Sequence, residues 1–463
     1  MADWVADYRE SIEDRAITPD VLPGEVAAQL DLAKWENPEP LERILRDLDE
    51  VVMPGIVHWA HPEFLGYFGS TSNAPALLGE IAAAALNVSA MTWRTSPAAT
   101  EMETVVLRWI QQLVGIPSGF TGIVYDTASV ATLHALTAAR EVSGPDIRSR
   151  GLAGRRDLPT YRVYASEEAH SSVAKAAIVL GIGEANVVRI RTDAEFRLDA
   201  GALEQAMDAD AKLGYRPLAV VATIGTTSCA SVDPVSSIGT LCEDRGVWLH
   251  VDAAYGGAIG ALPEGRWAMD GVERADSLVV NPHKWLFVPL DFSALYVRRP
   301  EILRSVFSLV PDYLRGDAAS AGSLDYMDFG IQLGRRFRAL KAWMVFRAFG
   351  RAGIVARIRE HCRLAELLAS WVRSEASFAM AAPVTMAVVC FRCQPEGVSE
   401  KETDDLNEAI VATVNAGARA YVTHTRLNGR VAIRVGIGNI LTTEQHVADA
   451  WTRMRAVAKE LLR

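Results

Sequence analysis

Between residues 100 and 300 the chain alternates short apolar runs with helical stretches, and this alternation restricts the fold more than any other feature. The runs that we predict as strands are Gly122–Tyr125, Tyr161–Ala165, Val187–Arg191, Leu218–Thr223, Val247–Val251, Ser277–Val280 and Phe292–Val297. The helices predicted between them are Ser129–Glu141, Ser171–Leu180, Ala200–Lys212 and Pro234–Arg245. Nearly continuous apolar strands that alternate with helices indicate an α/β fold with a mostly parallel, doubly wound sheet. Because ligands of such sheets bind beyond the carboxyl ends of the strands, we expect the chemistry in the residues that follow each strand.

The rest of the chain predicts two further parts around this sheet. Residues 1–73 read as short amphipathic helices around a Pro-rich bend, and they cannot form a core of their own. Residues 74–341 form the large domain with the sheet. Residues 342–463 form a small α+β domain, with a strand at Met386–Arg392 and a hairpin around Asn428-Gly429. Residues 309–333 are small and polar, as is typical of a disordered loop or a lid. A long helix is predicted after them, from 335 to 351.

The composition restricts the partners and the compartment. The 463 residues are 50% hydrophobic and 22% charged, which is globular composition, and the net charge of −10 argues against nucleic acid and anionic membranes as partners. The chain has five cysteines, and the pair Cys390 and Cys393 lies in a strand-like run, so buried thiols are favoured over a metal site. No signal sequence and no apolar run of about 18 residues is present. We therefore expect a soluble, cytoplasmic protein without a membrane partner.

Polar residues follow the predicted strands one after another, and each has an ordinary structural reading beside a chemical one. Asp126-Thr127-Ala128-Ser129 opens a helix, as a simple N-cap or as a cup for a phosphate. His170 precedes a helix, as a capping histidine or a ligand. Asp252 ends a strongly apolar strand, where a carboxylate needs a cation or strong donors. Lys284 follows Asn281-Pro-His283, where an exposed lysine or a desolvated, nucleophilic amine would fit.

Together these residues meet the needs of one ligand. Pyridoxal 5'-phosphate requires an amine nucleophile, a carboxylate at its pyridine nitrogen, a ring to stack on and a phosphate cup. The glycines of Gly181-Ile-Gly183 do not predict a dinucleotide site, because they follow a helix and a third glycine is missing.

Two blocks of the sequence resemble those of one known protein family. The blocks His250-Val-Asp-Ala-Ala-Tyr-Gly-Gly257 and Asn281-Pro-His-Lys-Trp285 resemble signature blocks of the pyridoxal-phosphate-dependent group II amino acid decarboxylases, closest to the aromatic-L-amino-acid (DOPA/tryptophan/tyrosine) branch. The resemblance extends over nearly the whole chain. It includes Met53-Pro-Gly-Ile-Val-His-Trp59, Ser96-Pro-Ala-Ala-Thr-Glu101, Ala169-His-Ser-Ser172 and Leu333-Gly-Arg-Arg-Phe-Arg338. It implies a type I aminotransferase-like fold, a carboxy-lyase activity, and a homodimer with interfacial active sites in which residues 1–73 pack at the interface.

The same resemblance implies a role for each site residue. Lys284 would form the Schiff base, Asp252 would pair with the pyridine nitrogen, His170 would stack on the ring, and Ala254 would lie on its other face. The residues implied for the phosphate are Thr127, Ala128, Ser129, Asn281 and His283, with Thr227 near the phenolic oxygen. Tyr313 would protonate the carbon from which carbon dioxide has left. The residues implied for the substrate pocket are Trp59, Tyr67, Phe68, Ser70 and Met91.

The substrate remains open among DOPA, tyrosine, tryptophan and phenylalanine. Gly69 and Met91 depart from residues common in relatives, and the aromatic segment His58–Ser72 reads equally as junction packing or as the lining of a cleft. An aldehyde synthase and a decarboxylase of a non-aromatic amino acid are alternatives. Against the aldehyde synthase, the chain retains Tyr313 and His170, which the resemblance associates with an amine product. Against an acidic substrate, the segment His58–Ser72 has no Arg or Lys, although Arg94 is not far away in the sequence. A non-catalytic binding protein of the same fold is the alternative from a different class.

Overall fold

The computed structural model describes residues 2–30, 36–69, 72–309 and 324–463, and its contacts divide the chain into two compact units. Ser70–Glu366 and Ala382–Val388 form the first, here named the sheet unit. Met1–Gly69, Leu367–Ala381 and Val389–Arg463 form the second, the terminal unit. The three-part division at residues 73 and 341 remains a prediction.

The sheet unit is built on a 7-stranded sheet with the strand order β1-β7-β6-β5-β4-β2-β3. Its strands are β1 (Thr121–Tyr125), β2 (Tyr161–Ser166), β3 (Val187–Ile190), β4 (Arg216–Thr223), β5 (Trp248–Asp252), β6 (Ser277–Val280) and β7 (Ser293–Val297). Strand β7 is antiparallel to its neighbours β1 and β6, and the pairs from β6 across to β3 are parallel. The predicted α/β fold with a mostly parallel sheet is confirmed.

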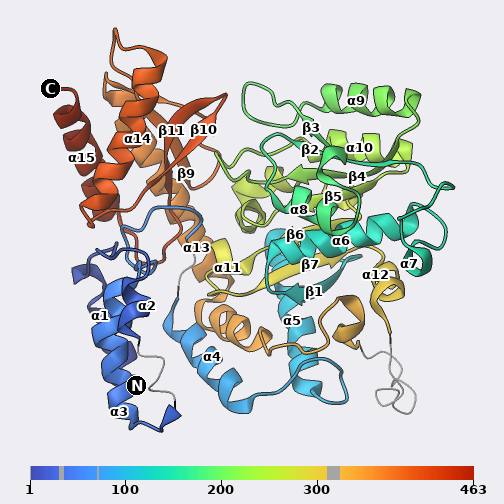
Figure 1. Ribbon diagram of the computed structural model, residues 1–463, viewed down its shortest axis with the longest axis horizontal. Helices are drawn as coiled ribbons and strands as arrows, with labels where there is room; N and C mark the ends of the chain where they lie inside the picture. The colour runs from blue at the N-terminus through green and yellow to red at the C-terminus, as the bar shows by residue number, and fades with distance from the viewer. Residues whose placement is uncertain (1, 31–35, 70–71, 310–323) are drawn as a thin grey trace. The chain divides into compact units, whose positions relative to one another are not determined.

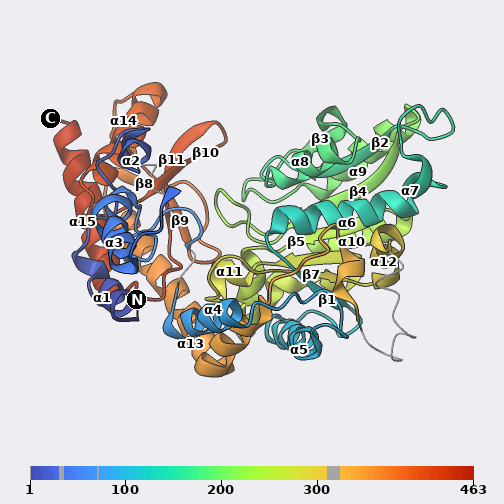
Figure 2. The same cartoon turned by 60° about the horizontal axis from the view of Figure 1, so that its bottom comes forward.

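Helices cover both faces of this sheet, as Figures 1 and 2 show. The helices of this unit are α4 (Ala74–Leu86), α5 (Pro97–Val114), α6 (Ala128–Val142), α7 (Ile147–Arg150), α8 (Ser172–Val179), α9 (Ala200–Lys212), α10 (Val235–Arg245), α11 (Pro282–Trp285), α12 (Pro300–Phe307) and the first part of α13 (Ala339–Ser374). Connections between parallel strands are right-handed crossovers. The connections that contain α6 and α8 run toward β3, so these helices lie on one face of the sheet. The connections that contain α9 and α10 run back toward β6, so these helices lie on the other face. Every residue of β5, β6 and β7 is buried, which explains why these strands read as continuous apolar runs.

The terminal unit combines short helices with a 4-stranded sheet of order β10-β11-β9-β8. Its elements are α1 (Ala2–Glu10), α2 (Glu25–Gln29), α3 (Leu41–Asp47), β8 (Phe378–Met380), β9 (Val388–Cys393), α14 (Glu400–Ala416), β10 (Thr423–Leu427), β11 (Arg430–Gly436) and α15 (Glu444–Leu461). The predicted hairpin is confirmed, since Asn428 (φ 50°) and Gly429 (φ 78°) form the turn between β10 and β11. Cys390 and Cys393 are buried on β9, as predicted.

The long helix predicted at 335–351 begins later than expected, whereas its predicted end lies one residue past a break in the observed helix. Helix α13 begins at Ala339, and its dihedral angles break at Gly350 (φ 61°) before it continues to Ser374. It starts late because the backbone of Arg335 is bonded to another segment: its carbonyl accepts from the N–H of Ala90 at 2.8 Å, and its N–H donates to Oγ of Ser89 at 3.3 Å. Its side chain makes a buried ion pair, with 2.6 Å between its Nη2 and Oε1 of Glu103. A glycine with positive φ interrupts a helix at little steric cost, which explains the break.

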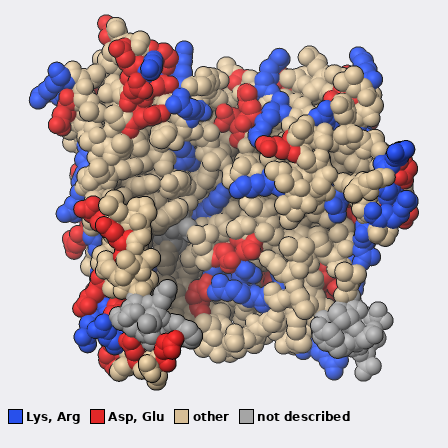
Figure 3. Space-filling view, in the orientation of Figure 1, with Lys and Arg blue, Asp and Glu red and all other residues tan. Residues whose placement is uncertain are grey.

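The structure also bears on the predicted loop 309–333, on membrane-spanning helices and on the charged surface. Most of the predicted loop 309–333 lies outside the described residues, and its last part contains a buried 3₁₀ helix, Tyr326–Phe329. Across the described residues, we find no helix with the length and apolar character that a bilayer span requires. On the face drawn in Figure 3, Lys and Arg side chains are interspersed with Asp and Glu.

Candidate active site

The carboxyl ends of the central strands meet at one edge of the sheet. Asp252, the last residue of β5, lies opposite Thr223 of β4 on one side and Val279 of β6 on the other. Strand β7 runs the other way and starts at this edge, where Ser293 faces the end of β1 at Tyr125. The residues that follow β1, β4, β5 and β6 are therefore neighbours in space, as the sequence predicted.

The backbone around Lys284 is held by buried contacts on one short helix. The N–H of Lys284 donates to the carbonyl of Asn281 at 2.9 Å. The next residue, Trp285, is buried, stacks on Tyr255 with 5.0 Å between ring centroids, and donates from Nε1 to Nδ1 of His361 at 3.0 Å. Trp285 therefore anchors α11, and Lys284 is left partly exposed at the sheet edge.

His170, Asp252 and Lys284 act on one another electrostatically. Burial lowers the pKa of His170, Lys284 lowers it further, and the carboxylate of Asp252 opposes both effects. Nδ1 of His170 accepts from the backbone N–H of Ser172 at 3.2 Å, so the neutral imidazole carries its proton on Nε2. Asp252 is buried and accepts from the N–H of Ala254 at 3.1 Å. The structure thus brings together the three residues that the sequence singled out first.

The predicted phosphate cup consists of neutral groups that follow β1 and β6, the two strands on either side of β7. Thr127 caps α6, and Ala128 and Ser129 begin that helix. Asn281 follows β6, and its Oδ1 accepts from the hydroxyl of Ser293 at 2.6 Å. Burial lowers the pKa of His283 to about 3, and its Nδ1 accepts from the N–H of Phe292 at 2.9 Å. His283 is therefore neutral at physiological pH and can act as a donor through Nε2.

Thr223, the last residue of β4, was not among the site residues that the sequence predicted, although Thr226 and Thr227 follow the same strand. Thr226 is buried and fully engaged, because its Oγ1 accepts from the N–H of Ser231 at 3.0 Å, whereas Thr227 is exposed. Thr223 is also buried, yet no described residue makes a hydrogen bond to its Oγ1. A buried hydroxyl without a partner is costly, which suits a side chain that bonds to a ligand. The available signal was its position as the last residue of a strand beside Asp252.

These residues fit pyridoxal 5'-phosphate. The site offers an amine at Lys284, a buried carboxylate at Asp252, neutral donors at the start of α6, and the unpartnered hydroxyl of Thr223. These are the groups that a phosphate, a pyridine nitrogen and a carbonyl carbon require.

The residues predicted for the substrate pocket are divided between the two units. In the terminal unit, Trp59 stacks on Phe64 and Tyr67 with centroid distances of 4.6 and 5.4 Å, and the hydroxyl of Tyr67 lies 3.2 Å from that of Tyr421. The guanidinium carbon of Arg434 lies 4.6 Å from the centroid of the Phe68 ring. Met91 belongs to the sheet unit, where its carbonyl accepts from the N–H of Met327 at 3.0 Å. Ser70 and Tyr313 lie outside the described residues.

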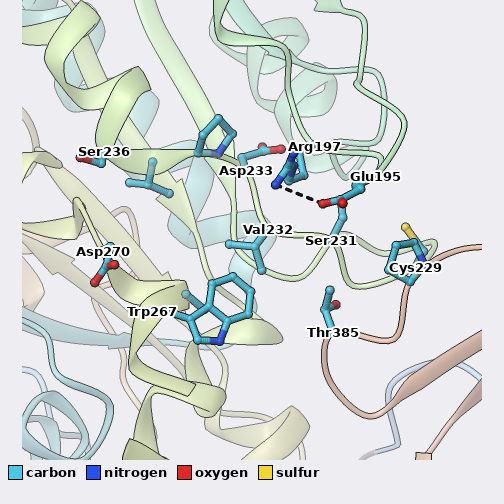
Figure 4. Close-up of a pocket in the computed structure, with 14 residues that line it drawn as sticks. Glu195, Arg197, Cys229, Ser231, Val232, Asp233, Ser236, Trp267, Asp270 and Thr385 are labelled. Atoms are coloured by element: carbon cyan, nitrogen blue, oxygen red, sulfur yellow. Dashed lines mark ion pairs between the residues drawn. The ribbon is translucent and has the colours of Figure 1, made fainter. Parts of the chain in front are cut away.

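A separate pocket of about 260 Å³ in the sheet unit contains none of the predicted site residues. Figure 4 shows Trp267 and Asp270 on one side, with the ion pair of Arg197 and Glu195 on the other. Its wall includes Asp233, a buried carboxyl group whose pKa burial raises to about 7 and whose oxygens accept from the N–H groups of Thr223 and Leu198. Asp233 therefore supports the end of β4 from behind the site.

Comparison with known proteins identifies the family. The conserved domain of pyridoxal-dependent decarboxylases matches residues 23–394. The chain is 38% identical to aromatic-L-amino-acid decarboxylase of Sus scrofa, covering 100% of this chain and 95% of that protein, and 36% identical to phenylacetaldehyde synthase of Arabidopsis thaliana, covering 100% and 95%. The crystal structure of Oryza sativa TDC with PLP and tryptamine superposes with a TM-score of 0.96 at 36% identity, covering 100% of this chain and 96% of that one. The chain therefore belongs to the family of pyridoxal-dependent decarboxylases, whose cofactor is pyridoxal 5'-phosphate.

Proposed function

We propose that this protein removes the α-carboxylate of an aromatic L-amino acid as carbon dioxide and releases the arylalkylamine. The observation that carries the proposal is the electrostatic cluster of His170, Asp252 and Lys284 at the carboxyl edge of the sheet. A chain that served only as a binding protein would have no use for a nucleophilic lysine beside a buried carboxylate.

Each site residue then has a task. Bound pyridoxal 5'-phosphate supplies an electron sink for the pair left when carbon dioxide departs. Lys284 would hold the cofactor through its amine, Asp252 would pair with the pyridine nitrogen and keep it protonated, and His170 and Ala254 would contact the ring. Neutral donors hold the phosphate and the phenolic oxygen, namely Thr127, Ala128, Ser129, Asn281, His283 and Thr227. Tyr313 returns a proton to the α-carbon.

The aromatic substrate class is supported by side chains and by relatives. Trp59, Tyr67 and Phe68 offer stacking surfaces, Ser70 and Met91 complete the proposed pocket, and the pig relative is named for aromatic amino acids. The phenylacetaldehyde synthase at 36% identity favours one alternative, in which decarboxylation is coupled to oxidative deamination.

We also propose a cytoplasmic homodimer whose active sites lie at the subunit interface, with residues 1–73 as an arm at that interface, 74–341 as the cofactor domain and 342–463 as the small domain. Large apolar side chains are exposed on α3 and α4: Leu41 at 62%, Ile44 at 53%, Leu78 at 58% and Ile81 at 62%. Exposed apolar area of this kind is typical of a surface that another chain covers. The five free cysteines suit a reducing compartment.

The test combines spectroscopy with product analysis. Purified wild type should show the visible absorbance band of a Schiff base, and Lys284→Ala should lose both the band and the activity. Lys212→Ala, which removes an exposed lysine at the end of α9, is the matched control and should keep both. A panel of aromatic and acidic L-amino acids is scored for carbon dioxide, amine and hydrogen peroxide.

We expect amine and carbon dioxide in equal amounts from an aromatic substrate, without stoichiometric peroxide. Peroxide and ammonia as main products would favour the aldehyde synthase. A wild type that stays colourless after addition of the cofactor would exclude the enzymatic proposal altogether.

A further inference from the structure

Asp126 places a carboxylate directly beside the proposed phosphate cup. It stands between the end of β1 and the first residue of α6. Its Oδ1 accepts from the backbone N–H of Thr127 at 2.6 Å and from the hydroxyl of Thr127 at 3.3 Å. Both donors that Thr127 could offer to a phosphate are therefore already used by a neighbouring anion.

The hydroxyl of Thr127 cannot serve both anions at once. A hydroxyl has one proton to donate. Here that proton goes to Asp126, while the oxygen accepts from the N–H of Val130 at 3.5 Å and so caps the helix. A phosphate that bonds to Thr127 must take the place of the Asp126 carboxylate.

The charge of Asp126 is not neutralised nearby. Among the described residues Asp126 makes no ion pair, and its Oδ2 accepts from the neutral amide of Gln332 at 3.3 Å. The carboxylate of Asp126 acts electrostatically on His134, but burial lowers the pKa of His134 to about 4, so this histidine is neutral. The cup residue His283 is neutral as well. A phosphate that bonded to Thr127 would lie next to the carboxylate of Asp126, which bonds to the same residue, and like charges at short range repel.

We propose that Asp126 competes with the cofactor's phosphate for Thr127 and thereby weakens cofactor binding, so that this protein holds pyridoxal 5'-phosphate in a readily exchangeable form. The inference rests on the proposed function, since it assumes that Thr127, Ala128 and Ser129 receive the phosphate. It assigns to Asp126 a positioning role that acts through Thr127.

The experiment measures affinity rather than turnover. Full-length protein freed of cofactor is titrated with pyridoxal 5'-phosphate, and the Schiff-base absorbance gives the Kd for wild type, Asp126→Asn and Asp126→Gly. Pyridoxal, which lacks the phosphate, is titrated in parallel. Asp199→Asn is the matched control, because Asp199 is also a carboxylate at the start of a helix, where it accepts from the N–H of Ala202. Thermal unfolding of each cofactor-free variant shows that it is folded.

We expect Asp126→Asn to bind pyridoxal 5'-phosphate about tenfold more tightly than wild type, a difference of about 1.4 kcal/mol. Asp126→Gly should bind at least as tightly, and Asp199→Asn should match wild type. The Kd for pyridoxal should be the same in all four proteins. Unchanged affinity in both Asp126 variants, or an equal gain with pyridoxal, overturns the inference. A wild type with no Schiff-base band, by contrast, would reject the proposed function itself.

Discussion

Two buried threonines three residues apart should respond in opposite directions to the same substitution. Thr223 has a buried Oγ1 without a described partner, whereas Oγ1 of Thr226 accepts from the N–H of Ser231 and lies 3.1 Å from the hydroxyl of Ser231. Valine has nearly the shape of threonine but no hydroxyl. In the cofactor-free protein, Thr223→Val should therefore stabilise the fold, and Thr226→Val should destabilise it.

The magnitudes follow from the hydrogen bonds. Burying a hydroxyl without a partner costs about 1–3 kcal/mol, so its removal from Thr223 should recover roughly 1–2 kcal/mol. Thr226→Val leaves the buried N–H of Ser231 without its acceptor and should cost a similar amount. For a unit larger than 250 residues, 1 kcal/mol corresponds to about 2 °C or less in the unfolding temperature. The two variants differ by about 2–4 kcal/mol, so their unfolding temperatures should differ by up to about 4–8 °C.

Addition of the cofactor should reduce or abolish the stability advantage of Thr223→Val over wild type. A ligand that binds only the folded chain stabilises it in proportion to its affinity. If the hydroxyl of Thr223 bonds to the cofactor, the variant loses about 1 kcal/mol of that gain. The assay is thermal unfolding of the cofactor-free and cofactor-saturated proteins. The reasoning is refuted if Thr223→Val is destabilised as much as Thr226→Val without cofactor, or gains as much as wild type with it.

Two other predictions concern assembly and pH. Ile81→Glu on the exposed face of α4 should convert the proposed dimer to monomer in sedimentation velocity. Leu213→Glu, the same kind of change at an exposed apolar residue just after α9, should not; a monomeric wild type would reject the dimer. Burial lowers the pKa of His250 to about 4, so below about pH 6.5 the unfolded chain takes up a proton that the folded chain refuses, and stability falls as the pH drops toward 4. His250→Gln has no imidazole to take up this proton. Its free energy of unfolding in urea should therefore fall less steeply with decreasing pH than that of wild type, by about 1.4 kcal/mol per pH unit. Parallel pH profiles of the two proteins would contradict the lowered pKa of His250.

The sequence determined the type of sheet and the edge at which the site forms. Continuous apolar runs such as Ser277–Val280 can only be strands covered on both faces, and the helices between them impose parallel pairing. Parallel strands bring their carboxyl ends to one edge. His170, Asp252 and Lys284 could therefore be grouped without coordinates, since each follows or ends a strand.

The choice among neighbouring polar residues could not be made in this way. Thr223, Thr226 and Thr227 are chemically alike and adjacent in sequence, yet one has an unpartnered hydroxyl, one is fully bonded and one is exposed. Hydrogen bonding depends on what the rest of the chain places nearby. The partner of Thr226, for example, comes from a turn five residues later.

The start of α13 was misplaced for the same reason. The backbone of Arg335 bonds to Ser89 and Ala90, and its side chain bonds to Glu103, 232 residues earlier in the chain. Such long-range contacts leave no local pattern.

The amino-acid sequence by itself thus determined the mostly parallel sheet, and it predicted a pyridoxal-phosphate site at the carboxyl edge of that sheet, because apolar periodicity and the residue types after each strand are local properties. Only the tertiary structure decided which hydroxyls are free for a ligand, and it revealed that Asp126 already occupies the donors of Thr127. Those properties depend on distances between side chains, on burial and on the balance of charge around the cup, all of which arise when distant segments pack together.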